Sequence, residues 1–358
     1  MPDARNFDLL DSSLFLELTR TPDVMEAIAG DLPAKSWLVV DEVQKSPQLL
    51  EEVHRLMEKR KWRFALCGSS ARKLRRGGVN LLGGRAVTRE LLPFCSKELG
   101  KDFNLSHALQ WGLLPLVQQE QDNAADILDS YVHTYIKQEI QEEGLVRNLA
   151  PFARFLSVAG QLNGQLVNAL NISRDASVPR STVDVYFSIL VDTLLGNFLQ
   201  AYRPKAKVRE GAHPKFYWFD PGVARAAAGF LHDPADRLWL GSALETLILH
   251  ELRVYNHTSN LNRGIFFYRT GDSEIDFVIE TRKRRPGSAA RVVCIEVKMA
   301  EKWDRKWEKP MRSLAADGKV KVYKMFGVYM GGRSYDYDGL KVLPVEKFLR
   351  QMFEGEVF

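Results

Sequence analysis

The stretch SWLVVDEVQ, residues 36–44, belongs to a pattern of short apolar runs and amphipathic stretches that decides the fold class. Four segments are predicted to be strands: NFDLLD (6–11), SWLVVDEV (36–43), RFALCGSS (63–70) and RAVTRELLPF (85–94). PQLLEEVHRLMEKR (47–60) has apolar residues at helical spacing and is predicted to be a helix between the second and third strands. Strands that alternate with helices favour an α/β domain with a largely parallel sheet.

Composition excludes several protein classes. Of the 358 residues, 45% are hydrophobic and 27% are charged, which excludes collagen-like, mucin-like and wholly disordered chains. The net charge of +5 permits a nucleic-acid partner without requiring one. Three widely spaced cysteines without a CxxC motif argue against a disulfide framework or a structural zinc site. No apolar run reaches the roughly 18 residues of a membrane span, so we expect a cytoplasmic protein without a membrane partner.

The pattern divides into three predicted domains, 1–105, 106–205 and 206–358, and the middle one is mainly helical. Within it, VNALNISRDASVPRSTVDVYFSIL (167–190) has the rhythm of a helix-turn-helix, with a turn at 177–179. Arg180, Ser181 and Thr182 would begin the second helix and are the candidate DNA-binding residues. A helical connector that binds no nucleic acid stays open as the alternative, because Asp184 on the same face would repel phosphate.

Two acids end the second predicted strand. In P-loop ATPases an acid such as Asp41 orients the magnesium shell, and one such as Glu42 polarises the attacking water, so both are candidate catalytic residues. Ser69 or Ser70 at the next strand end could reach the γ-phosphate, and Arg85 after a glycine pair could act as an arginine finger. The alternative is that the acid pair only ends a strand and caps the following helix.

The sequence contains no GxxxxGK[ST] motif, whose backbone amides and lysine hold phosphates in P-loop proteins. The Gly-Lys pairs at 100–101 and 318–319 lack the upstream glycine and the following Ser or Thr. We therefore expect that the chain as written does not bind ATP in the P-loop manner. ATP would be a cofactor only if a P-loop precedes Met1.

A second set of chemically suggestive residues lies in the C-terminal third. Glu296 and Lys298 in RVVCIEVK (291–298) are two positions apart on a predicted strand and share a face. If RKRRPGS (282–288) is a hairpin tip, Asp276 in EIDFVIE lies beside Glu296, and Glu245 on the preceding helix adds another carboxylate. This order is similar to that of PD-(D/E)xK nucleases. Glu245, Asp276 and Glu296 would bind Mg²⁺, with Glu296 and Lys298 as catalytic residues. A salt-bridged strand edge is the open alternative.

The sequence as a whole resembles bacterial and archaeal ATP-binding proteins that join an AAA-type ATPase domain to a C-terminal domain of unknown function, DUF4143. The matching segments are FDLLDSSLFLEL, WLVVDEVQKSPQLLEEVHRLME, FALCGSSARKLRRGGVNLLGGRA, YVHTYIKQEIQEEGLVRNL, HPKFYWFDPGV, ALETLILHELR and CIEVK. The resemblance implies an incomplete P-loop ATPase-type parallel sheet, a winged-helix-like middle and a nuclease-like C-terminal α/β domain. Family members carry a P-loop strand and helix before the segment that begins here at Met1, so we expect a truncated or mis-started chain.

Two hypotheses follow. In the first, the protein is a member of the ATPase family whose C-terminal domain cleaves nucleic acid with Mg²⁺. In the alternative, it is a non-enzymatic regulatory or interaction protein with vestigial ATPase and nuclease sites. Nucleic acid and a second copy of the chain are the partners considered.

Overall fold

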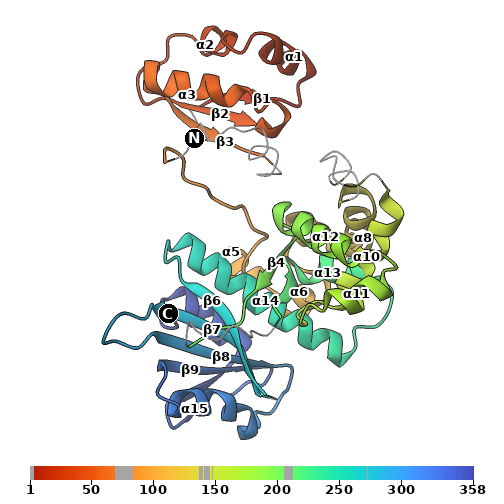
Figure 1. Cartoon of the computed structure of the whole chain (residues 1–358), viewed down its shortest axis with the longest axis vertical. Coiled ribbons are helices and arrows are strands. Elements are labelled where there is room, and N and C mark those ends of the chain that lie inside the picture. The colour runs from red at the N-terminus through yellow and green to blue at the C-terminus, as the bar shows by residue number, and fades with distance from the viewer. Residues whose placement is uncertain are drawn as a thin grey trace. The chain divides into compact units, whose positions relative to one another are not determined.

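The computed structural model describes residues 4–68, 84–136, 140, 146, 148–204, 213–271 and 273–358. The chain folds into two units, one formed by residues 1–91 with 192–194 and the other by residues 92–191 with 195–358 (Figure 1). The three domain ranges derived from the sequence stay a prediction.

The N-terminal unit contains a three-stranded parallel sheet in the order β1-β2-β3 (Figure 1). Its elements are β1 (Arg5–Asp8), α1 (Ser12–Arg20), α2 (Val24–Ala29), β2 (Trp37–Asp41), the 3₁₀ helix η1 (Val43–Lys45), α3 (Leu49–Arg60) and β3 (Arg63–Leu66). Leu38 and Val40 of the central strand are fully buried and pack with Leu56 of α3 in one core. The predicted parallel α/β arrangement and the helix between the second and third strands are therefore confirmed.

The predicted strand over residues 85–94 is wrong. None of these residues has strand structure, and Val87 and Leu91 are 77% and 99% exposed. Ala86, Val87 and Leu91 face solvent, Pro93 is buried, and no described strand pairs with the segment. The backbone N–H of Phe94 donates to the carbonyl of Leu113 at 3.0 Å. Apolar residues form a strand only where neighbouring strands and side chains pack against them.

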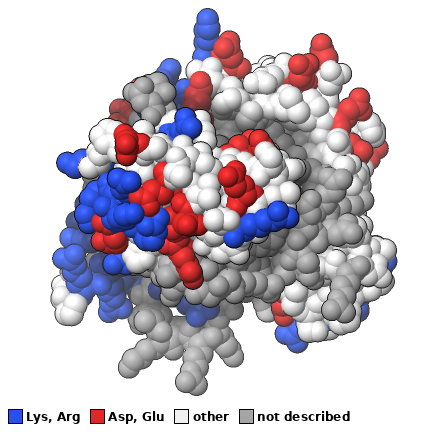
Figure 2. Space-filling model, turned by 90° about the horizontal axis from the view of Figure 1, so that it is seen from above, with Lys and Arg blue, Asp and Glu red and all other residues white. Residues whose placement is uncertain are grey.

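Charged residues of both signs share the surface. Figure 2 shows Lys and Arg side chains that adjoin Asp and Glu side chains on the face drawn. In the N-terminal unit, Arg55, Lys59 and Arg60 of α3 all contact Glu26 of α2 at 2.6–3.0 Å. The hydrogen bonds from Arg55, then Lys59 and Arg60, lower the pKa of Glu26 to about 2. Because these cations are already paired, the end of α3 is not an open basic patch.

Helices make up most of the middle of the chain. They are α5 (Ser96–Leu99), η2 (Gly100–Asp102), α6 (Leu105–Trp111), α7 (Pro115–Gln119), η3 (Gln121–Asn123), α8 (Ala124–Ser130), the π-helix η4 (Tyr131–Tyr135), α10 (Leu149–Gln161), α11 (Ala169–Asp175), α12 (Arg180–Asp192) and α13 (Pro221–Ala228). Two short antiparallel strands, β4 (Gly196–Leu199) and β5 (Lys215–Trp218), accompany them. Helices α11 and α12 lie where the helix-turn-helix rhythm predicts them. The winged-helix assignment stays a prediction.

The C-terminal part is a six-stranded mixed sheet in the order β10-β11-β9-β8-β7-β6 (Figure 1). Its strands are β6 (Gly264–Thr270), β7 (Ser273–Arg282), β8 (Arg291–Lys298), β9 (Lys321–Tyr329), β10 (Tyr335–Tyr337) and β11 (Leu340–Pro344). Its helices are α14 (Arg237–Thr258), η5 (Arg305–Glu308), α15 (Lys309–Ala316) and α16 (Val345–Phe353). Strands β6, β7 and β8 are antiparallel in turn, whereas β9 runs parallel to β8. The hairpin predicted around residues 282–288 is therefore confirmed.

The two faces of this sheet are covered by different helices. Phe277, Ile295 and Val328 belong to the core that contains α14 and α16, whereas Val278 and Cys294 belong to the core that contains α15. Side chains alternate between the two cores along β8, as the pleat requires. None of the helices in the described ranges is both long and apolar enough to cross a membrane.

Candidate functional site

The acid pair lies at the carboxyl end of the N-terminal sheet. Asp41 is the last residue of β2, and Glu42 follows it with a left-handed backbone, φ 55°. Glu42 accepts a hydrogen bond from Gln44 Nε2 at 2.6 Å, and its own N–H donates to Asp41 Oδ1 at 3.0 Å. Partial burial, then the charges of Asp41 and Glu42, raise the pKa of the Cys67 thiol just beyond β3. The two acids and Cys67 thus share one edge of the sheet.

The other predicted nucleotide-binding residues are placed only in part. Ser69 and Ser70 lie outside the described residues. Arg85 is half exposed, and its Nε lies 3.6 Å from Glu58 Oε1 near the end of α3. The structure therefore pairs Arg85 with a surface carboxylate of its own unit.

The predicted DNA-binding residues begin α12. Arg180 and Ser181 are exposed, whereas Thr182 is half-buried and its N–H donates to the Pro179 carbonyl at 2.9 Å. The backbone N–H of Thr182 is therefore used in the first turn of α12.

The C-terminal residues predicted from the E-x-K pattern do come together. Lys298 Nζ lies 2.5 Å from Glu296 Oε1 and 3.5 Å from Asp276 Oδ2. Asp276 Oδ2 also accepts the backbone N–H of Val297 at 2.7 Å, which fixes the carboxylate against β8. Asp276 and Glu296 are only 4% and 5% exposed. The antiparallel pairing of β7 with β8 brings residues 20 positions apart to one lysine.

Glu245 joins this cluster from α14, through residues that sequence reasoning did not single out. Tyr217 Oη donates to Glu245 Oε2 at 2.8 Å, and Lys215 Nζ lies 3.8 Å from the same oxygen. Lys215 is 7% exposed and also pairs with Glu274. Lys215 and Tyr217 are two positions apart on β5, so both reach the same side of that strand. In the sequence, these two residues could have been found from the K-x-Y spacing within HPKFYWFD. The hydrophobicity of that segment by itself predicts only a buried strand.

Burial changes the ionisation of these groups. Burial first, and then the nearby Asp276, raise the pKa of Glu245 to about 7 and the pKa of Glu296 well above its usual value. Burial alone would lower the pKa of Lys298, but Asp276 and Glu296 raise it above its usual range. Lys215 behaves likewise, because Glu245, Asp276 and Glu274 outweigh its burial. The lysines therefore stay charged, whereas Glu245 titrates near neutral pH.

The carboxylate groups of this cluster are ligands of the kind that a hard divalent cation prefers. Glu245, Asp276 and Glu296 offer carboxylate oxygens, and Glu296 Oε2 is buried without a hydrogen-bond partner in the described structure. Across the described ranges, however, no group of three His, Cys, Asp or Glu side chains is already placed to hold a metal ion. Instead, the ammonium groups of Lys215 and Lys298 each pair with two carboxylates. A cation at this site would use the oxygen of Glu296 that the lysines leave unpaired.

Two solved structures show a distant likeness to the chain. Protein VC1899 from Vibrio cholerae is 11% identical with a TM-score of 0.23, over 99% of this chain and 97% of that one. Can2 from Sulfobacillus thermosulfidooxidans, solved with cyclic tetra-adenylate, is 10% identical with a TM-score of 0.20, over 98% and 96%. Neither supports an argument about fold or function. None of the curated proteins matches the chain.

Three protein families match consecutive parts of the chain. An AAA domain matches residues 3–100, a domain of unknown function (DUF8612) matches residues 91–233, and a domain of unknown function (DUF4143) matches residues 240–348. The first includes the acid pair after β2, and the last includes Glu245, Asp276, Glu296 and Lys298. The first and last are the two families that the sequence resemblance predicted. The chain is therefore an AAA-type protein with a C-terminal DUF4143 domain.

Proposed function

We propose that the C-terminal domain cleaves phosphodiester bonds in nucleic acid with the help of Mg²⁺, at the cluster formed by Glu245, Asp276, Glu296 and Lys298. One observation carries the proposal. Two buried carboxylates from neighbouring strands converge on a single lysine, and one of their oxygens, Glu296 Oε2, has no hydrogen-bond partner in the described structure. Groups this costly to bury are most often retained for binding or catalysis.

Each residue has a separate role in this proposal. Glu245, Asp276 and Glu296 would hold Mg²⁺, which when bound neutralises a scissile phosphate and acidifies a water molecule. Lys298, charged and half-exposed, would stabilise the negative charge that develops on the phosphate oxygens. Glu245, with a pKa of about 7, can give up its proton near neutral pH and become a metal ligand. The hydrogen bond that Tyr217 donates keeps the Glu245 carboxylate in place.

The proposal also rests on where the cluster sits. Asp276 lies near the start of β7, and Glu296 and Lys298 lie near the end of β8, so the antiparallel pair presents all three at one end of the sheet. Helix α14 supplies the fourth residue. A helix carboxylate, a strand aspartate and an E-x-K strand end in this order are what a PD-(D/E)xK-like nuclease domain would need.

The test is a cleavage assay on the whole chain. Labelled DNA and RNA, single- and double-stranded, are incubated with Mg²⁺ or Mn²⁺, and Lys298→Met and Glu296→Gln are compared with wild type. Removal of the charge-stabilising lysine is expected to slow cleavage by about 100-fold or more. Glu346→Gln, an exposed glutamate at the start of α16, is the matched control and should cleave normally. The proposal fails if no substrate is cut, or if both cluster variants cut as fast as wild type.

The non-enzymatic alternative has one observation in its favour. Lys215 and Lys298 each pair with two of the acids, so ion pairs hold the cluster together without any metal. Under this alternative Mg²⁺ does not change the stability of the protein, and Lys298→Met is simply destabilising because it leaves buried acids unpaired. Unfolding with and without metal separates the two functions.

A further inference from the structure

We propose that a groove beside the cluster binds single-stranded nucleic acid and leads the strand to Lys298. The proposal rests on the proposed nuclease function and names the form of substrate it takes. The groove, called here the tryptophan groove, is lined chiefly by Arg237, Met299, Trp303, Arg305, Trp307 and Met330.

The tryptophan groove begins where the cluster ends. Met299 directly follows Lys298, and the Ala300 N–H donates to the Lys298 carbonyl at 2.8 Å. Met330 in turn donates its N–H to the Ala300 carbonyl at 3.0 Å, so the loop after β8 is fastened to the end of β9. One wall of the groove is thus continuous with the strand that carries Glu296 and Lys298.

Trp303 lies on the same face of the sheet as Glu296. Glu296 and Gly327 are direct neighbours on parallel strands, so their side-chain directions coincide. A Cβ added at Gly327 would come within 2.5 Å of the Trp303 indole. The indole therefore covers the backbone of Gly327, next to the Glu296 carboxylate.

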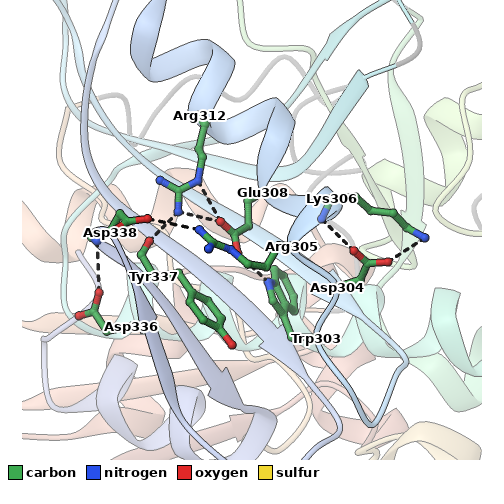
Figure 3. A network of polar contacts seen from close by, with 10 residues as sticks. Trp303, Asp304, Arg305, Lys306, Glu308, Arg312, Asp336, Tyr337 and Asp338 are labelled. Atoms are coloured by element: carbon green, nitrogen blue, oxygen red, sulfur yellow. Dashed lines mark hydrogen bonds and ion pairs between the residues drawn. The ribbon is translucent and has the colours of Figure 1, made fainter.

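Trp303 belongs to a network of polar contacts (Figure 3). Trp303 Nε1 donates to Glu308 Oε1 at 3.3 Å, and the Glu308 side chain is only 2% exposed. Arg305 and Arg312 converge on the same carboxylate, with Arg312 Nη2 at 2.7 Å. Trp303 and Trp307 meet edge to face with ring centres 5.2 Å apart. Because the Trp303 indole is held by its hydrogen bond to Glu308 and Trp307 packs against it, the pair can receive a flat ligand with little further ordering, which saves binding free energy.

The size and charge of the groove favour a polymer over a small ligand. Its volume is about 1180 Å³, at or above the upper end for sites that enclose one small molecule. Arg237, Lys302 and Arg305 line it against two acids, Glu301 and Asp304. Asp304 is itself paired with Lys306 at 2.9 Å. Arg305 is paired with Glu308 and Asp338, each at 3.3 Å, so Arg237 and Lys302 are the exposed cations placed to meet phosphates along a chain. The partly exposed indoles of Trp303 and Trp307 are placed to meet its bases.

Stacking on tryptophan requires bases that are not paired. In a duplex each base is covered by its neighbours, whereas a single strand presents the faces of its bases to protein aromatics. Such stacking tolerates any base, so we expect binding with little dependence on sequence. Single strands of DNA and RNA both present flat bases and phosphates to the tryptophan groove, and the experiment distinguishes the two.

The test measures binding by fluorescence anisotropy of labelled oligo(dT) and oligo(rU) of about 16 nucleotides, the upper range of single-strand site sizes. EDTA is present, so cleavage plays no part. The expected result is that a single strand binds at least about tenfold tighter than a duplex of the same length. Trp307→Ala should weaken binding by about 5-fold or more, and Trp307→Phe should largely restore it. Arg237→Gln should reduce the slope of log K against log salt by about 0.7.

Tyr323→Ala is the matched control, because Tyr323 is a 49% exposed aromatic that stacks with Arg291 on β8, away from the groove. Binding that Tyr323→Ala weakens as much as Trp307→Ala, or that favours the duplex, overturns the proposal. The outcomes also separate strand binding in the tryptophan groove from the proposed nuclease activity. A strand that is bound but never cut leaves the groove standing and removes the nuclease activity. A strand that is cut equally well by wild type and Trp307→Ala, with unchanged affinity, removes the groove alone.

Discussion

The buried Glu251 of α14 should make the folded protein less stable as the pH rises. Its side chain is fully buried, and its two oxygens accept the Ser96 N–H at 2.7 Å and the Ser96 hydroxyl at 2.9 Å. Burial, opposed by these hydrogen bonds, raises the pKa of Glu251 from 4.5 to about 7. The folded protein therefore holds this proton more tightly than the unfolded chain does. The contribution of Glu251 to stability is greatest below about pH 4.5 and is lost as the pH rises through 7.

The size of this effect follows from the two pKa values. A rise from 4.5 to about 7, at about 1.4 kcal/mol per pH unit, amounts to about 3 kcal/mol of unfolding free energy lost on ionisation. Glu251→Gln keeps the shape and cannot ionise, so the variant should lose about 3 kcal/mol less than wild type between pH 5 and pH 8. Urea unfolding at the two pH values measures this difference directly.

Glu354→Gln, an exposed glutamate after α16, should show the same pH dependence as wild type. Other buried acids contribute equally to all three proteins and cancel in the comparison. Equal pH dependence of wild type and Glu251→Gln would refute the reasoning, because the Glu251 carboxyl would then have the same pKa folded and unfolded.

Three further predictions concern other buried contacts. Asp220→Ala should lower the unfolding free energy by about 2–4 kcal/mol in urea titrations, because Asp220 caps α13 and its loss leaves buried backbone N–H groups unpaired; an unchanged midpoint would contradict this. Gly160→Ala should cost about 1–3 kcal/mol, since a Cβ there would lie 2.4 Å from the Ala228 nitrogen, and a Tm equal to that of wild type would show that α10 and α13 can separate freely. Lys215→Met should raise the pKa of Glu245, because it removes a nearby positive charge; the pH midpoint of cleavage should move upward and not downward.

Local sequence periodicity was enough to predict the core of the C-terminal cluster. Glu296 and Lys298 share a face because they are two positions apart on a strand, and the hairpin turn at 282–288 returns the chain beside Asp276. The same reasoning placed the parallel strands and the helix of the N-terminal unit. These features depend on periods of 2 and 3.6 residues, which neighbouring residues determine.

Contacts between distant segments could not be predicted in this way. Lys215 reaches Glu245 across 30 positions, and Arg305 of η5 pairs with Asp338 across 33 positions. Their positions depend on how β5, α14 and η5 pack. The strand prediction for residues 85–94 was wrong because their apolar side chains pair with no described strand. Asp41 and Glu42 lie at the expected strand end, but their role in nucleotide chemistry stays a prediction.

The most direct test of the central claim is a calorimetric titration of the whole chain with Mn²⁺. If Glu245, Asp276 and Glu296 form a metal site, wild type should bind one ion, with affinity that rises between pH 6 and pH 8 as Glu245 loses its proton. Glu296→Gln should abolish this binding, and the exposed control Glu346→Gln should keep it. The absence of binding to wild type, or equal binding to Glu296→Gln, would contradict a metal-dependent centre and leave the ion-paired cluster as a structural feature.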